Sequence, residues 1–102
     1  MLRTAQQKKT LCRDCPVARA ADVLGDSCTL LLVRDLLSGS KRFGDLQASL
    51  QGISSRTLTN KLKSLEKSGI ILHQDAVYIL TKKGKGLAPV EKALRTYGKK
   101  YL

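Results

Sequence analysis

The stretch from Ser54 to Gly69, SSRTLTNKLKSLEKSG, constrains the fold of this chain more than any other segment. At 3.6 residues per turn its leucines fall on one narrow stripe, and a set of polar side chains falls on the opposite face. The leucines are Leu58, Leu62 and Leu65, and the opposing residues are Arg56, Asn60, Lys63 and Lys67. Ser54 or Ser55 can cap the first turn, and a glycine such as Gly69 is typical of a helix end. The segment is therefore predicted to be a short amphipathic helix.

The polar face of this helix carries residue types that contact DNA. An arginine can donate two hydrogen bonds to guanine in the major groove, and an asparagine can pair with adenine. We expect base contacts from Ser55, Arg56, Thr59 and Asn60. An ordinary surface helix with a solvated polar face shows the same pattern, so the neighbouring segments decide between the two interpretations.

The charge of the chain favours a polyanionic partner. Its 102 residues include 19 Lys and Arg against 8 Asp and Glu, a net charge of +11. Nucleic acid is the first candidate, and an anionic membrane surface is the second. No run approaches the roughly 18 apolar residues of a membrane span, and residues 1–11 lack the apolar region of a signal peptide. We therefore expect one cytoplasmic domain, and the odd number of cysteines, 3, argues against a secreted disulfide framework.

The segment before Ser54 predicts the first half of a helix-turn-helix. Residues 43–50, FGDLQASL, are expected to form a brief helix with Leu46 and Leu50 inward, followed by a turn at Gln51 and Gly52. Two short helices joined by a glycine-containing turn are the helix-turn-helix unit. We expect phosphate contacts from its basic residues, namely Lys41, Arg42, Lys61, Lys63 and Lys67.

The segment after Gly69 changes to a strand pattern. Residues 70–72 and 77–80 are apolar and partly β-branched, and His73 to Ala76 are expected to form the turn between them. A hairpin directly after a recognition helix is a wing. Its turn contains no Lys or Arg, so we expect it to add little phosphate binding.

Two helices are predicted before the helix-turn-helix. The first begins at Pro16 and ends at Leu24 before Gly25, with its buried side formed by Val17, Ala20, Ala21 and Leu24. The second, residues 28–38, is capped by Asp26 or Ser27 and is apolar over most of its circumference. It is expected to be the central buried helix.

The C-terminal segment predicts a dimer interface. Thr81 is expected to cap it and Pro89 to mark a helix start, so that a helix spans about residues 86–101. Its apolar residues at spacings of three and four are Leu87, Val90, Leu94, Tyr97 and Tyr101. Such a terminal stripe is expected to meet its copy across a two-fold axis. Packing within its own domain is the alternative.

Cys12 and Cys15 are separated by two residues, and Cys15 stands immediately before Pro16. This spacing suits half of a zinc site, but His73 is the only histidine and no second cysteine pair follows, so no metal site within one chain is predicted. A site shared by two chains is the alternative. Cys15 precedes a helix N-terminus near Arg13 and Arg19, which favours its thiolate and predicts a redox switch. A thiol without functional consequence is the competing interpretation.

Several motifs taken together resemble the HxlR family of winged-helix transcriptional regulators, relatives of the MarR type. They are C-P-V at residues 15–17, L-G at 24–25, LLVRDLLSG at 31–39, K-R-F at 41–43, Leu46 and the run GISSRTLTNKLKSLEKSGII at 52–71. The resemblance covers about residues 15–98. It implies a prokaryotic homodimer with the Ser54 helix in the major groove and terminal helices at the dimer interface. It also implies that Cys15, which matches the family's thiol before proline, can sense quinones, aldehydes or oxidants. The hairpin departs from the family pattern, because it is shorter and lacks the family's basic residues.

The sequence thus predicts a mainly α-helical fold with a small β-hairpin. Residues 1–11 are expected to be a flexible basic arm, and residues 12–102 a winged helix-turn-helix domain. The leading hypothesis is a sequence-specific dimeric transcriptional regulator that binds double-stranded DNA, more often a repressor, without a cofactor. The alternatives are a non-specific architectural nucleic-acid-binding protein and a protein-interaction module. The chain shows no phosphate loop, complete metal set or catalytic triad spacing, so we expect no enzyme.

Overall fold

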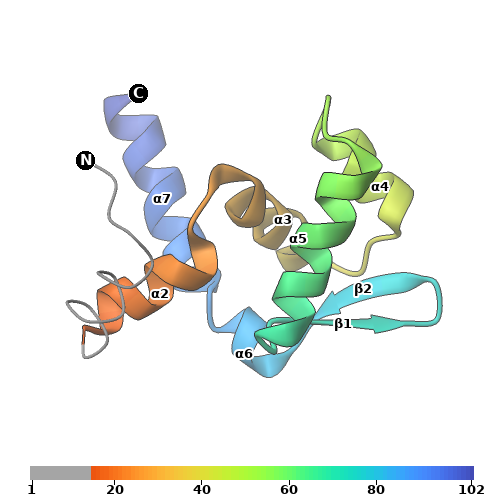
Figure 1. Cartoon of the computed structure of the whole chain (residues 1–102). Coiled ribbons are helices and arrows are strands. Elements are labelled where there is room, and N and C mark those ends of the chain that lie inside the picture. Colours follow the sequence, from red (N-terminus) through yellow and green to blue (C-terminus); the bar gives the residue numbers. More distant parts are fainter. Residues whose placement is uncertain (1–14) are drawn as a thin grey trace.

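A computed structural model describes residues 15–102 and confirms the mainly helical fold with one antiparallel hairpin (Figure 1). The elements, in chain order, are α2 (Pro16–Leu24), α3 (Ser27–Leu37), α4 (Phe43–Ser49), α5 (Ser55–Lys67), β1 (Ile71–Gln74), β2 (Val77–Leu80), α6 (Lys82–Lys85) and α7 (Ala88–Tyr101). The hairpin extends from the end of α5, whereas α2 and α7 lie on the opposite side of α3 (Figure 1). The predicted arm at residues 1–11 lies outside the described residues.

The leucine stripe of α5 forms the centre of the core. Leu58, Leu62 and Leu65 are all at most 2% exposed. They belong to one buried cluster with residues of α3, α4 and the hairpin: Leu32, Leu36, Leu46, Leu50, Ile70, Ile71, Tyr78 and Leu80. The predicted inward direction of the α5 leucines is confirmed, and the opposite face of this helix is left to solvent.

The central position predicted for the second helix is confirmed in part. Asp26 caps α3 by accepting a hydrogen bond from the Thr29 N–H at 2.8 Å. Leu32, Val33 and Leu36 are buried, but Leu31 is 37% exposed. One side of α3 therefore remains open, because α2 and α7 do not cover it completely.

The buried side predicted for α2 is wrong for the single chain. No residue of α2 is buried, and Val17 is 77% exposed. The helix meets the core near its C-terminal end, where Val23 packs against the buried cluster and Leu24 is half-buried. An apolar helical pattern indicates which face avoids water, but it does not indicate whether the same chain covers that face.

The hairpin is tighter than predicted. Its strands continue to Gln74 and resume at Val77, so the turn consists of Asp75 and Ala76 only. Asp75 has a φ of 54°, a left-handed conformation that aspartate tolerates in tight turns. His73 is therefore a strand residue, although it was predicted in the turn, and its ring stacks on that of Tyr78 with centroids 4.1 Å apart.

A separate one-turn helix, α6, follows β2 and was not predicted. It packs closely on the residue before β1: a Cβ added to Gly84 would lie 2.2 Å from the backbone oxygen of Ile70. Only glycine fits at this contact without movement of the backbone. The contact fixes α6 against the end of α5 and the base of the hairpin.

We expect Gly84→Ala to lower the free energy of unfolding by about 1–3 kcal/mol, because the added methyl group overlaps backbone that must move. Urea unfolding followed by circular dichroism measures the change. Gly44→Ala in α4 is the matched control, because a Cβ there meets nothing within 4 Å. Equal stability of the Gly84 variant and the wild type would contradict this packing.

Candidate nucleic-acid interface

The N-terminus of α5 is held by hydrogen bonds from its own cap and from α4. Ser54 Oγ accepts the Thr57 N–H at 3.1 Å, which selects Ser54 from the two predicted caps. Gln47 of α4 donates from Nε2 to Ser55 Oγ at 3.0 Å and lies 3.5 Å from the Ile53 carbonyl oxygen. Gln47 thus links the two helices of the helix-turn-helix. This contact was not predicted from the sequence. The position of a glutamine between the inward residues Leu46 and Leu50 could have indicated it.

The outward face of α5 carries the predicted base-contacting residues together. Arg56 and Asn60 are exposed, Thr59 is half-buried, and no hydrogen bond or ion pair joins these three side chains to another described residue. Ser55 is also exposed, but its hydroxyl oxygen already accepts one hydrogen bond from Gln47, which leaves its proton and one lone pair for another partner. The guanidinium and carboxamide groups are therefore open to an external partner.

The predicted phosphate-contacting residues fall into different environments. Lys63 and Lys67 are exposed on α5 without a described partner. Lys41 and Arg42 lie directly before α4: Lys41 exchanges backbone hydrogen bonds with Tyr78, and the Arg42 N–H donates to Asp45 Oδ2 at 3.2 Å. The backbone at Lys41 and Arg42 is thus fixed by the hairpin and by α4. The side chain of Arg42 is exposed and that of Lys41 is half-buried.

Lys61 differs from the other lysines of α5. Its Nζ donates to Asp26 Oδ2 at the start of α3, and the pair joins the recognition helix to the central helix. The hydrogen bond from Lys61 lowers the pKa of Asp26, and the same bond raises the pKa of Lys61. An ammonium already paired with a carboxylate has less to gain from a phosphate, so Lys61 is better described as a link between helices than as a phosphate contact.

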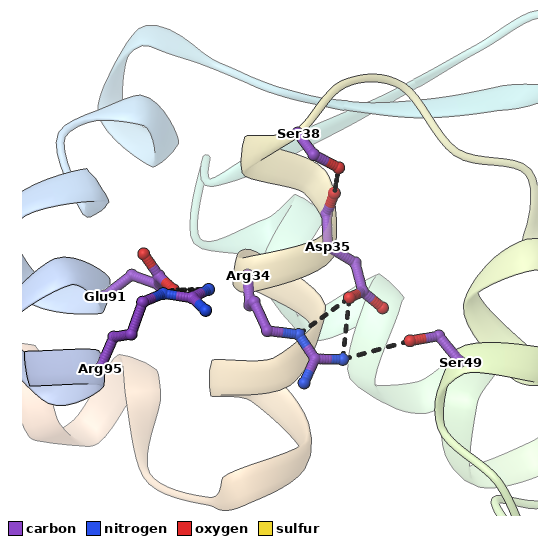
Figure 2. A network of polar contacts seen from close by, with 6 residues as sticks. All are labelled: Arg34, Asp35, Ser38, Ser49, Glu91 and Arg95. Atoms are coloured by element: carbon purple, nitrogen blue, oxygen red, sulfur yellow. Dashed lines mark hydrogen bonds and ion pairs between the residues drawn. The ribbon is translucent and has the colours of Figure 1, made fainter. Parts of the chain in front are cut away.

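A second polar network joins α3 to α4 (Figure 2). Arg34 donates from Nε to Asp35 Oδ1 at 3.0 Å and from Nη2 to Ser49 Oγ, at the end of α4, at 3.2 Å. In the same view Ser38 donates to the backbone oxygen of Asp35. Arg34 therefore bridges the central helix and the first helix of the helix-turn-helix.

The predicted dimer stripe is largely uncovered in the single chain. Val90, Leu94, Tyr97 and Tyr101 are 39%, 49%, 58% and 62% exposed. Leu87 packs partly against the core. An apolar groove of about 370 Å³ runs beside this stripe, between α2, α3 and α7, and is lined mainly by Leu24, Leu30, Leu31, Leu87, Val90 and Leu94.

The two cysteines of the described residues occupy different environments. Cys15 is exposed and forms the N-cap position of α2, where its carbonyl oxygen accepts the Arg19 N–H at 3.0 Å. Cys28 is half-buried on α3, and burial, followed by the charge of Asp26, raises the pKa of its thiol. Cys12 lies outside the described residues. Within residues 15–102, no helix has the length and apolar character of a membrane span.

The chain is similar to proteins of a known family. A family described as HxlR-like helix-turn-helix matches residues 23–102. The uncharacterized HTH-type transcriptional regulator YvaP of Bacillus subtilis is 39% identical over 85 residues, which cover 74% of this chain and 78% of YvaP. A MarR-family regulator of Porphyromonas gingivalis superposes with a TM-score of 0.80 at 26% identity, covering 87% of this chain and 94% of the other. Quinone-bound YodB of B. subtilis superposes with a TM-score of 0.77 at 30% identity, covering 85% and 99%.

The Asp26–Lys61 pair predicts a pH-dependent contribution to stability. A lowered carboxyl pKa stabilises the folded protein above the unfolded pKa of Asp, and this gain is lost as the pH falls through the folded pKa. Both side chains are about a third or more exposed, at 34% and 40%, so we expect Lys61→Met to cost at most about 1 kcal/mol at pH 7. The difference from wild type should shrink between about pH 5 and pH 2.

Urea unfolding of the wild type and of Lys61→Met across this range measures the difference. Lys63→Met is the control, because Lys63 has no carboxylate partner in the described part of the chain, so its replacement leaves no carboxylate unpaired. A loss for the Lys61 variant that is the same at every pH would contradict the role given to Asp26.

Proposed function

The chain belongs to the HxlR-like helix-turn-helix family of transcriptional regulators, and we propose that it binds operator DNA sequence-specifically as a dimer. The observation that carries the proposal is the division of α5 into two faces. Its leucines are buried in the core, whereas Arg56 and Asn60 are exposed and have no partner among residues 15–102. In a helix-turn-helix protein, this outward face of the second helix enters the major groove.

We assign base contacts to Arg56 and Asn60, with Ser55 and Thr59 assisting. Arginine matches the two acceptors of guanine, and asparagine matches the donor and acceptor of adenine. The assignment is supported by the fixed start of α5, since Gln47 and Ser54 hold its first turn. Lys63 and Lys67 on the same helix, and Lys41 and Arg42 before α4, are assigned to phosphates, which position the protein without reading sequence.

A dimer is proposed through the C-terminal helix. The apolar side chains of α7 are exposed in the single chain, and burying them against a second copy removes them from water. Two protomers would then place their α5 helices in half-sites about 34 Å apart, or a multiple of that distance. Such a dimer bound over a promoter in the cytoplasm would repress transcription by excluding the polymerase.

We further propose that Cys15 makes binding responsive to oxidants or electrophiles. YodB, a structural neighbour at 30% identity, has been solved bound to a quinone. Cys15 is exposed at the start of α2, and α2 borders the groove beside the proposed dimer helix. A covalent adduct or disulfide at this position would alter the packing of α2 against a partner and could release the operator.

Selection of bound duplexes from a random pool tests the proposed function. A dimeric regulator should enrich an inverted repeat and prefer it over random duplex by roughly a thousandfold or more. The net charge of +11 favours a non-specific architectural protein as the second candidate. Enrichment of no sequence would support that candidate and reject the regulator.

On the selected duplex, Arg56→Ala should cost about 1–3 kcal/mol of binding free energy and relax the preference at one operator position. Lys67→Ala is the matched control on the same helix face, because loss of a phosphate contact weakens all sequences alike and lowers the salt dependence. Fluorescence anisotropy with specific and random duplexes measures both. Equal losses on the two duplexes for the Arg56 variant would refute a base contact.

The Cys15→Ser variant tests the redox proposal. Because only the sulfur is replaced, binding under reducing conditions should stay at the wild-type level, while release by a quinone or by diamide should be lost. Cys28→Ser is the control, since burial raises the pKa of that thiol and reduces its thiolate fraction. Release of the Cys15 variant at wild-type oxidant concentrations would show that this thiol is not the sensor.

A further inference from the structure

The lysines of α6 are not part of the helix-turn-helix, yet the structure fixes this short helix against the end of the recognition helix. Thr81 Oγ1 accepts the Gly84 N–H at 3.1 Å and lies 2.6 Å from the Gly69 carbonyl oxygen. The Thr81 N–H donates to the Ile70 carbonyl oxygen at 3.0 Å. Together with the close contact at Gly84, these bonds hold α6 rigidly beside the C-terminal end of α5.

One lysine of α6 reaches the recognition helix itself. Lys83 Nζ donates to the Ser68 carbonyl oxygen, at the C-cap of α5, at 2.8 Å. An ammonium group has three donors, so two remain available after this bond. Lys83 is exposed, and its bond holds its charge at Ser68, the residue that follows the last residue of α5. Lys82 is exposed and without a described partner.

The charge around this end of α5 is strongly positive. No acidic residue stands between Asp75 and Glu91, and Glu66 is the acidic residue on the last turn of α5. The hairpin from Ile71 to Leu80 contains no Lys or Arg. The hairpin therefore offers no lysine or arginine to a phosphate. The one-turn helix α6, which lies at the base of the hairpin beside the end of α5 (Figure 1), carries three lysines. Lys85 lines a hollow with Ser38 and Ile79, which leaves Lys82 and Lys83 as the candidates.

We propose that Lys82 and Lys83 form a second phosphate-binding surface, and that its partner is the sugar-phosphate backbone of the duplex bound by α5. This inference rests on the proposed function, because it assumes that the outward face of α5 meets DNA. Lysine suits the role as a charged anchor that does not read bases. A basic wing tip would contact phosphates, and here the lysines at the base of the wing would make that contact instead. Their position relative to α5 is fixed by the bonds described above.

The salt dependence of binding to a random duplex tests this surface. Each phosphate contact adds about 0.9 to the slope of log affinity against log salt, so Lys82→Gln/Lys83→Gln should reduce the slope by about 1.8 per bound chain. Affinities for the selected and the random duplex should fall by the same factor. Lys82→Gln alone should reduce the slope by about 0.9 without touching the bond from Lys83 to Ser68.

Lys92→Gln/Lys99→Gln is the control, since it removes the same charge from exposed positions of α7 on the side away from the apolar stripe. A control slope equal to that of the Lys82/Lys83 variant would overturn the proposal and indicate a general effect of net charge. An unchanged slope for both α6 variants would also overturn it. Failure of the wild type to select a sequence would reject only the specific regulator, because the slopes on random duplex would still test the α6 lysines.

Discussion

Burial of three leucines from α5 is the interaction on which the rest of the structure depends. Leu58, Leu62 and Leu65 enter one cluster with side chains of α3, α4 and the hairpin, and each contributes about 1.5–3 kcal/mol by leaving water. Because side chains on a helix keep a fixed angular relation, inward leucines force Arg56 and Asn60 outward. The outward direction of the surface that we propose for DNA binding is thus a consequence of core packing.

Polar contacts between helices also fix the position of that surface. Gln47 ties α4 to the first residue of α5, Lys61 ties the middle of α5 to the start of α3, and Lys83 ties α6 to the end of α5. The recognition helix is therefore held at both ends and in its middle. A helix held in this way can present side chains to base edges with little loss of freedom on binding.

The sequence predicted those features that depend on local periodicity and capping. The leucine face of α5, the caps of α5 and α3, each narrowed to two candidates, and the hairpin after Gly69 all follow from spacing within a few residues. Thr81 was expected to cap the C-terminal helix, but it caps α6 instead. The link between Asp26 and Lys61 could not be predicted, because it joins positions 35 residues apart that only the fold brings together. The exposure of Val17 was missed because the pattern of α2 shows an apolar face without showing what covers it. The α6 turn was missed because its lysines and glycines have no apolar period.

The central claim is that the outward face of α5 enters duplex DNA. Backbone amide chemical shifts of the isotope-labelled protein, recorded while the selected duplex is added, test it most directly. The account predicts that the largest changes fall at Ser55, Arg56, Thr59 and Asn60, with changes at the start of α4 and few in the middle of α7. Largest changes on α2 and α7, with α5 unaffected, would contradict it.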